Sequence, residues 1–345
     1  MPGRRWGGFA LILLLLPVAA YLGWRQGRAT VVTSSDIPLP AANSESETPV
    51  ARRFARPASA SPLPSLQTPL RDALPLLRQR ADAGEPAAAC RLAAEMEYCN
   101  QIRHRLMAAS EALQDQETLK RNPASGLPPD ALQNMREMMA ANSERLLKES
   151  EHCEGVPPAT AAERIHYWRQ AALGGSTPAL RHYAVGNAFR LNETLDNLDA
   201  LAVYRREAEA MAWRGASAGD LQTSLALASA LSPRRNEFRR YFLAQAVRPD
   251  EVKALALYLH LERQLGGAPA AMGPLREQVA QQVGELSAAL APDARSRARE
   301  IASGYAREWT RHSWAPGSSS PLGMQGGTPD AARTECAAPA GGPAG

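Results

Sequence analysis

Apolar positions in the middle of the chain recur at helical spacing. Between about residues 67 and 315 they return every three or four positions, and no stretch alternates strictly between apolar and polar residues. The first pattern is that of a helix with one buried face, whereas strict alternation would indicate a β-strand. Helix-start signals, with a proline in or beside the first turn, occur at Thr68-Pro69, Thr177-Pro178 and Pro249-Asp250. We therefore predict an all-α domain over residues 67–315.

Three glycines divide this region into similar segments. An alanine lies three residues before each glycine, and Leu-Ala or Tyr-Ala stands eight and nine residues after it. The glycines are Gly84, Gly175 and Gly219, the alanines are Ala81, Ala172 and Ala216, and the later pairs are Leu92-Ala93, Tyr183-Ala184 and Leu227-Ala228. Small residues let two helices approach closely, and a glycine after a helix closes the turn to the next one. The pattern predicts repeated helix pairs, with a weaker fourth unit over residues 253–267.

One segment resembles a known repeat. HYWRQAALGGSTPALRHYA, residues 166–184, is similar to the Sel-1-like repeat, a relative of the tetratricopeptide repeat. The matching residues are Trp168, Ala171, Ala172, Gly175, Ala179 and Leu180. Two more distant matches are a second unit with Trp213, Ala216 and Gly219 and a third around Gly84. The resemblance implies an α/α helical-repeat solenoid whose concave surface binds other proteins, and it implies no particular partner.

A helical hairpin is predicted as an insertion between the first two repeats, over residues 98–155. One heptad-like seam is formed by Cys99, Ile102, Leu106, Ala109 and Leu113, and a second by Leu132, Met135, Met139, Leu146 and Cys153, with Asn142 in one core slot. The segment NPASGLPP, residues 122–129, cannot remain helical and separates the two seams. Folding back at this turn brings Cys99 opposite Cys153.

The four cysteines allow more than one pairing. A Cys99–Cys153 disulfide would close a loop of about 54 residues and contribute about 4 kcal/mol. Cys90 lies nine residues before Cys99, on the opposite side of the same helix, and the alternatives are a Cys90–Cys153 bridge or none. Cys336 is interpreted as a free or incidental thiol. Disulfides persist in oxidising compartments such as the periplasm.

The two ends of the chain differ from its middle. Arg4 and Arg5 precede an apolar stretch over residues 7–24, so residues 1–28 are interpreted as an uncleaved transmembrane anchor or a cleaved signal peptide, and otherwise as a buried helix of a cytoplasmic protein. Residues 29–66, rich in Pro, Ser and Ala, are predicted to be a disordered spacer, and residues 316–345 a disordered tail. The richness in Ala, Arg, Pro and Gly suggests a GC-rich bacterium. We therefore expect a single inner-membrane pass with the bulk of the chain in the periplasm, or a soluble periplasmic protein after cleavage.

Composition and motifs limit the kinds of ligand and reaction that the sequence supports. A net charge of +4 is too small for a nucleic-acid binder. Residues 215–219 spell the G-x-S-x-G pattern of hydrolases, but a helix rather than a strand is predicted before Ser217. The six histidines show no zinc-site spacing, and no phosphate-binding loop is present, so we predict no metal and no cofactor. The cluster Arg234, Arg235, Arg239 and Arg240 is interpreted as a solvated helix face, or as a contact with lipid headgroups or an acidic partner.

These observations favour a non-enzymatic scaffold or adaptor that binds other proteins of the bacterial cell envelope. The alternative is a cell-envelope enzyme or enzyme accessory with an unrecognised site. Four aromatic residues have two interpretations, as the lining of a partner-binding groove or as core: Trp168, Tyr183, Tyr204 and Trp213.

Overall fold

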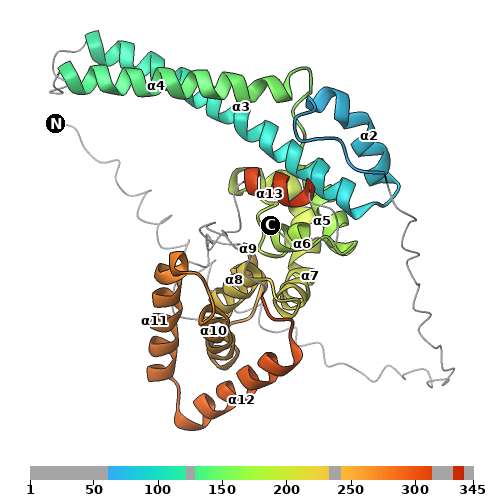
Figure 1. The fold of residues 1–345 in the computed structure, drawn as a ribbon, viewed down its shortest axis with the longest axis vertical. Coiled ribbons are helices and arrows are strands. Elements are labelled where there is room, and N and C mark those ends of the chain that lie inside the picture. Colours follow the sequence, from blue (N-terminus) through green and yellow to red (C-terminus); the bar gives the residue numbers. More distant parts are fainter. Residues whose placement is uncertain (1–60, 122–128, 233–241, 313–328, 338–345) are drawn as a thin grey trace, which may run out of the picture. The chain divides into compact units, whose positions relative to one another are not determined.

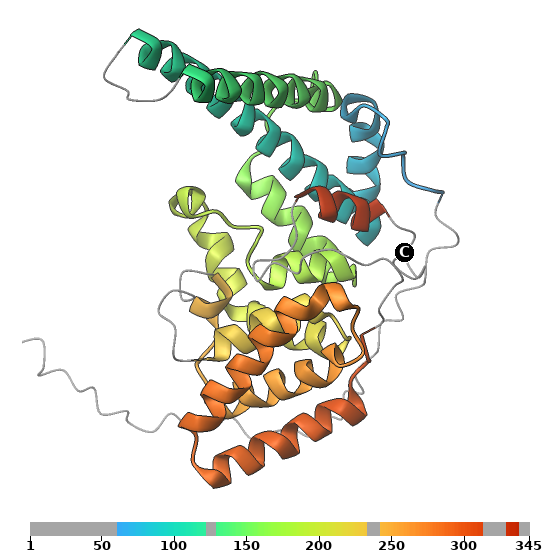
Figure 2. The same ribbon diagram turned by 60° about the vertical axis from the view of Figure 1, so that its left-hand side comes forward.

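The computed structural model describes residues 61–121, 129–232, 242–312 and 329–337, all within the compact unit that begins at Ser61 (Figures 1 and 2). In these ranges every regular element is an α-helix or a short 3-10 helix. The all-α prediction is therefore confirmed for the described residues. None of the described helices is both long and apolar enough to cross a bilayer, and the apolar stretch over residues 7–24 lies outside the described residues.

Tight turns join the helices into packed pairs. The pairs are α2 (Leu70–Asp82) with α3 (Pro86–Arg121), α5 (Ala161–Leu173) with α6 (Thr177–Ala184), and α7 (Leu198–Ser217) with α8 (Leu221–Leu231). Neighbouring pairs pack through α3 on α5 and α6 on α7, while α8 packs on α9 (Phe242–Ala246) and α10 (Glu251–Leu265). The last layer packs α10 against α11 (Gly273–Ala289) and α12 (Pro292–Glu308). This arrangement is consistent with a helical-repeat fold.

The three predicted glycine turns have the same geometry. Gly84, Gly175 and Gly219 adopt φ values of +89°, +94° and +87°. In each turn the glycine N–H donates to the carbonyl of the alanine three residues earlier, and the next N–H donates to the carbonyl five residues earlier. This is the Schellman arrangement that satisfies carbonyls at a helix end. The three alanines and the three later residue pairs are all buried. The sequence repeat is therefore also a structural repeat.

Two repeat predictions do not hold. Gly266 ends α10 with φ −59°, and a 3-10 turn over Ala270–Met272 follows, so residues 253–267 do not reproduce the glycine turn. Trp213 is not the counterpart of Trp168: it stands six rather than seven residues before its glycine, is only half-buried, and faces Tyr305 of α12 and Trp309 directly after it. Ala212, fully buried, occupies the equivalent position.

The helical hairpin is present, but it is not a separate insertion. Helix α3 runs unbroken for 36 residues, so one helix serves both as the second member of the first pair and as the first hairpin arm. The return arm is α4 (Pro129–Ser150), which packs alongside α3 and leads into the 3-10 turn η2 (Glu151–Cys153). Cys99 and Cys153 form the predicted disulfide, with Cα atoms 5.5 Å apart. Asn142, predicted in the seam, is instead exposed and accepts a hydrogen bond from Arg145.

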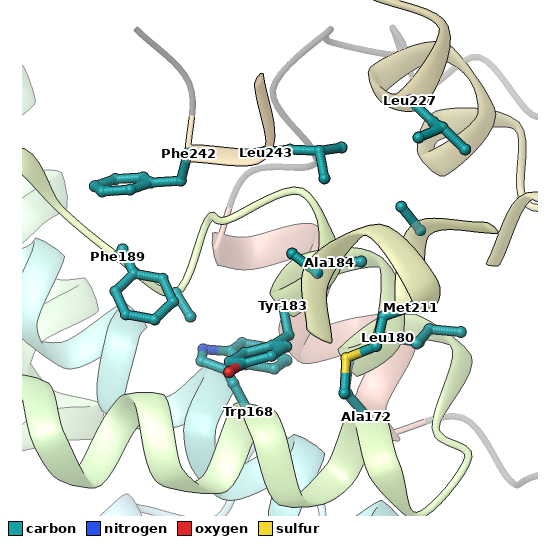
Figure 3. Packing of buried hydrophobic residues seen from close by; sticks show 14 of the residues in the cluster. Trp168, Ala172, Leu180, Tyr183, Ala184, Phe189, Met211, Leu227, Phe242 and Leu243 are labelled. Carbon is teal, nitrogen blue, oxygen red and sulfur yellow. The ribbon is translucent and has the colours of Figure 1, made fainter. Parts of the chain in front are cut away.

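Aromatic residues fill the interior between α5, α6, α7 and α9. Trp168, Tyr183 and Tyr204 are fully buried, with the Tyr183 and Tyr204 rings 5.5 Å apart. Figure 3 shows Phe189 below Phe242 at the edge of this cluster, and their ring centroids lie 5.5 Å apart. The core interpretation is thus the correct one for Trp168, Tyr183 and Tyr204, since groove-lining side chains would be exposed.

Two segments expected to be disordered are ordered where the structure describes them. The end of the predicted spacer, residues 61–66, lies against the helices: the carbonyls of Pro62 and Pro64 accept hydrogen bonds from Arg80 and Arg91. In the predicted tail, residues 329–337 form helix α13 (Pro329–Ala337). Short segments such as these become ordered through contacts with residues distant in sequence, which local composition does not show.

Candidate functional site

Helix α13 lies against α3 and α6, far from both in sequence. Figure 2 shows it in red beside the first part of α3. Cys336 of α13 is bonded to Cys90 of α3, with Cα atoms 5.4 Å apart, and both residues are buried. Cys336 is therefore not the free thiol that we expected. We call the surface that receives α13 the α13 site; its side chains are Cys90, Glu95 and Tyr98 of α3, His152 of η2 and Arg181 of α6.

A buried carboxylate is the centre of the α13 site. Glu95 has no exposed surface, and it accepts a hydrogen bond of 2.6 Å from Arg91 one turn earlier on α3. The Nε2 atom of His152 lies 2.9 Å from its carboxylate, and the Nε atom of Arg333 in α13 lies 3.0 Å away. Burial alone would raise the pKa of Glu95, but the His152 hydrogen bond and the charges of Arg333 and Arg91 outweigh it and lower the pKa. The site therefore holds a negative charge that α13 helps to compensate.

Arg333 makes further contacts besides the ion pair. Its guanidinium carbon lies 4.0 Å from the centroid of the Tyr98 ring, within the range of a cation–π interaction. One of its terminal nitrogens lies 3.5 Å from the carbonyl of Leu66 and 3.2 Å from Nε2 of His152. The ordered end of the predicted spacer is thus part of the wall that surrounds this arginine.

A second ion pair of opposite polarity holds the next part of α13. Arg181 of α6 donates to Glu335 at 2.8 Å and to Asp220, the N-cap of α8, at 2.8 Å. Burial would lower the pKa of Arg181, but the two carboxylates raise it above its ordinary value. The α13 site thus offers an anion to Arg333 and a cation to Glu335, in addition to the sulfur of Cys90.

A separate polar cluster lies on another face of α3. Glu97 is 5% exposed; it accepts a hydrogen bond of 3.1 Å from Trp168 and lies 2.8 Å from Nε2 of His182. The Trp168 and His182 rings stack 3.9 Å apart. Burial alone would raise the pKa of Glu97, but His182, Arg164 and Arg190 lower it to about 2. Because the cluster is enclosed and joins α3 to α5 and α6, we interpret it as part of the core.

The hydrolase motif does not have the geometry of a nucleophile site. Ser217 is the last residue of α7, and its hydroxyl donates to the carbonyl of Arg214. A nucleophile elbow requires a strand before the serine, whereas here the serine ends a helix of 20 residues. Across the described part of the chain, no group of three or more His, Cys, Asp or Glu side chains is placed to hold a metal ion.

The structure separates the predicted site residues into three groups. Cys99 and Cys153 come together as predicted. Six of the repeat-defining residues lie in the core or form its turns, namely Trp168, Ala171, Ala172, Gly175, Ala216 and Gly219, and Gly84 forms the first turn. The basic cluster Arg234, Arg235, Arg239 and Arg240 lies outside the described residues.

Sequence reasoning missed the α13 site, although two signals pointed to it. Cys90 faces away from Cys99 and so requires a different partner, and an even number of cysteines leaves Cys336 for it. The segment Pro329–Ala337 also begins with Pro-Asp, a combination common in the first turn of helices.

Comparisons with known families, curated proteins and solved structures found no match to this chain.

Proposed function

We propose that the chain is a non-enzymatic scaffold or adaptor of the bacterial cell envelope, related to Sel-1-like repeat proteins, which binds other envelope proteins. The observation that carries this proposal is α13 itself. The helical body holds a short helix through side chains of α3, α6 and η2. A surface that binds one helix in this way is suited to protein recognition.

The charges of the α13 site support recognition of a defined partner. Glu95 and Arg181 present opposite charges to Arg333 and Glu335 of the bound helix. Complementary charges of this kind fix orientation and disfavour partners that would bring like charges together. The site therefore discriminates between helices by their charge order as well as by shape.

The cysteines and the N-terminal sequence support the envelope location. All four cysteines form disulfides, which persist in oxidising compartments such as the periplasm. Residues 7–24 are apolar and follow Arg4 and Arg5, as in a signal peptide or membrane anchor. We propose an inner-membrane anchor with the helical body in the periplasm, or a soluble periplasmic form after cleavage.

A second surface, on the hairpin, serves as the comparison for the α13 site in the capture experiment. Met107, Met138 and Leu147 are exposed on it, by 55%, 68% and 60%. A concavity of about 530 Å³ lies between α3 and α4, lined by Arg105, Ala108, Ala109, Ala112, Met139, Asn142, Ser143, Arg145 and Leu146. Exposed methionines are typical of adaptable binding surfaces.

Affinity capture of the full chain from crosslinked membranes tests the proposal. We expect a specific envelope protein to be recovered with Cys336→Ser, in which α13 is not covalently held. Adding Arg181→Ala should reduce recovery about tenfold, because the site then lacks its cation. The matched control adds Met107→Ala and Met138→Ala instead, and should leave recovery unchanged. Failure to recover a protein whose capture depends on Arg181 would contradict the proposal.

A further inference from the structure

We propose that the α13 site is a receptor for a short helix carrying arginine and glutamate two residues apart, and that α13 is its resident ligand. Opening of the Cys90–Cys336 disulfide by thiol–disulfide exchange releases that ligand. The inference rests on the proposed function, because it names the class of partner and the regulation of the same surface.

The body is arranged so that α13 can leave without exposing unpaired buried charges. After its departure Glu95 keeps Arg91 and His152, and Arg181 keeps Asp220. Removing one member of a buried ion pair is ordinarily costly because the other charge remains uncompensated. Here each charged group of the site has a second partner within the body. This arrangement is expected of a receptor that exists both empty and occupied.

α13 itself has the properties of a ligand rather than of a structural element. It is nine residues long, and helices shorter than about 12 residues are marginally stable in isolation. Its specific contacts come from Arg333, Glu335 and Cys336, within one turn. The pairs α2–α3, α5–α6 and α7–α8 pack on one another directly. Release of α13 therefore leaves the packing between the repeats intact.

The two disulfides differ in what they hold together. Cys99–Cys153 joins α3 to η2, and these elements also contact α2 and α4. Cys90–Cys336 joins α3 to a helix held by two ion pairs and a cation–π contact. Opening of the first bond leaves its two ends close together, whereas opening of the second lets α13 depart.

Release of α13 requires a dithiol reductant, which supplies two electrons to the Cys90–Cys336 disulfide. A thiolate of a dithiol reductant attacks Sγ of Cys336, the Sγ–Sγ bond breaks, and Cys90 leaves as a thiolate that takes up a proton. The second thiol of the reductant then displaces Cys336, which also becomes a thiol. The reductant ends as a disulfide, so the two electrons gained by the protein come from the dithiol.

The ion pairs of α13 control access to this bond. Cys90 is 0% and Cys336 is 3% exposed, so a reductant reaches the sulfurs only when α13 lifts from α3. Loss of the Glu335–Arg181 or Arg333–Glu95 contact makes lifting more frequent. The rate of reduction should therefore increase in variants of α13 that cannot form these contacts.

The first experiment measures reduction of the folded full chain. Oxidised protein is treated with dithiothreitol, trapped with iodoacetamide at intervals and analysed by mass spectrometry. We expect Cys90–Cys336 to open before Cys99–Cys153, and Glu335→Gln to accelerate only the first about tenfold. Arg145→Ala, on the hairpin, is the matched control and should change neither rate. Equal opening of the two bonds, or no effect of Glu335→Gln, would overturn the redox-controlled release.

The second experiment measures binding of a helix in trans. The probe is a fluorescent peptide of residues 329–337 with serine in place of cysteine, and the receptor is the full chain with Arg333→Ala and Cys336→Ser, which weaken its own α13. We expect a rise in anisotropy with this receptor and none with the oxidised wild-type chain. A peptide with arginine and glutamate exchanged should not bind. Equal binding to both chains would contradict release control, and absence of binding to the variant would overturn the receptor.

The peptide result and the membrane capture separate the two proposals. Arg181-dependent capture of an envelope protein together with absent peptide binding would overturn this inference alone. Peptide binding without any captured envelope protein would contradict the proposed function alone.

Discussion

At the scale of single residues, Gly219 occupies a position where both the backbone and the available space exclude a side chain. Its φ is +87°, and a Cβ atom there would lie 2.7 Å from the carbonyl oxygen of Thr310, in the segment that follows α12. Gly84 has nearly the same φ, +89°, but no atom lies within 4 Å of its Cβ position. A comparison of the two glycines therefore separates the free-energy cost of the left-handed backbone from that of the contact with Thr310.

We predict that Gly219→Ala destabilises the protein more than Gly84→Ala. The left-handed conformation costs an alanine roughly 1–2 kcal/mol at both positions. Crowding against Thr310 should add about 1–3 kcal/mol for Gly219→Ala. Urea unfolding of the two variants measures the difference, and equal free energies of unfolding would show that Thr310 moves aside without cost.

A second prediction concerns Glu97 and acid. Because the folded-state pKa of Glu97 is about 2, below its ordinary 4.5, its contribution to stability is complete above pH 4.5 and is lost as the pH falls towards 2. The difference corresponds to about 3 kcal/mol. Glu97→Gln should remove this part of the pH dependence, whereas Glu137→Gln, on the exposed hairpin surface, should preserve it. Thermal unfolding between pH 2 and pH 7 checks the sign, and unchanged curves for Glu97→Gln would contradict it.

At the scale of elements, the hairpin was predictable because the residue patterns that define it are local and periodic. The two apolar seams and the turn between them predicted both arms and the Cys99–Cys153 bond. The continuity of α3 was not apparent, because the hairpin was predicted as an insertion that begins at residue 98, whereas one helix runs from Pro86 to Arg121. Helix α13 was missed for another reason: its partner Cys90 is 246 residues away, and a nine-residue helix has too few positions to show a period.

We predict that the hairpin disulfide contributes to global stability. Replacing Cys99 and Cys153 with serine together should lower the free energy of unfolding by about 4 kcal/mol, because a loop of 54 residues is no longer closed in the unfolded chain. Thermal unfolding without reductant measures this. Cys336→Ser is the comparison: it opens a longer loop of 246 residues, and faster hydrogen exchange should be confined to α13 and its site. A double serine variant as stable as the wild type would contradict the prediction.

At the scale of the whole molecule, spacing alone predicted an all-α repeat body and the position of its tight turns. The Ala-x-x-Gly pattern succeeded because a Schellman turn with a buried alanine demands those residue types. Trp213 was misassigned because a shift of one residue on a helix turns a side chain by about 100°. The α13 site was not predicted as a whole, since its residues come from three elements, α3, η2 and α6, that only the tertiary fold brings together.

A prediction at this scale links export to oxidation. The full chain should be recovered from bacterial membranes or periplasm with both disulfides formed, whereas a chain lacking residues 1–28 should remain in the reducing cytoplasm with four thiols. Alkylation before lysis followed by mass spectrometry distinguishes the two states. Four free thiols in the full chain would contradict the envelope location.

The Cys90–Cys336 bond also determines how the protein responds to mechanical force. A repeat array normally carries tension through every repeat in turn, because each contacts only its neighbours. Here a pull between residues 61 and 337 passes from α2 into the start of α3, across the sulfur–sulfur bond, and out through the end of α13. The bypassed loop of 246 residues would otherwise extend to roughly 800 Å. While the bond is intact, stretching the chain from these two points loads α2 and the start of α3 but not the later helix pairs.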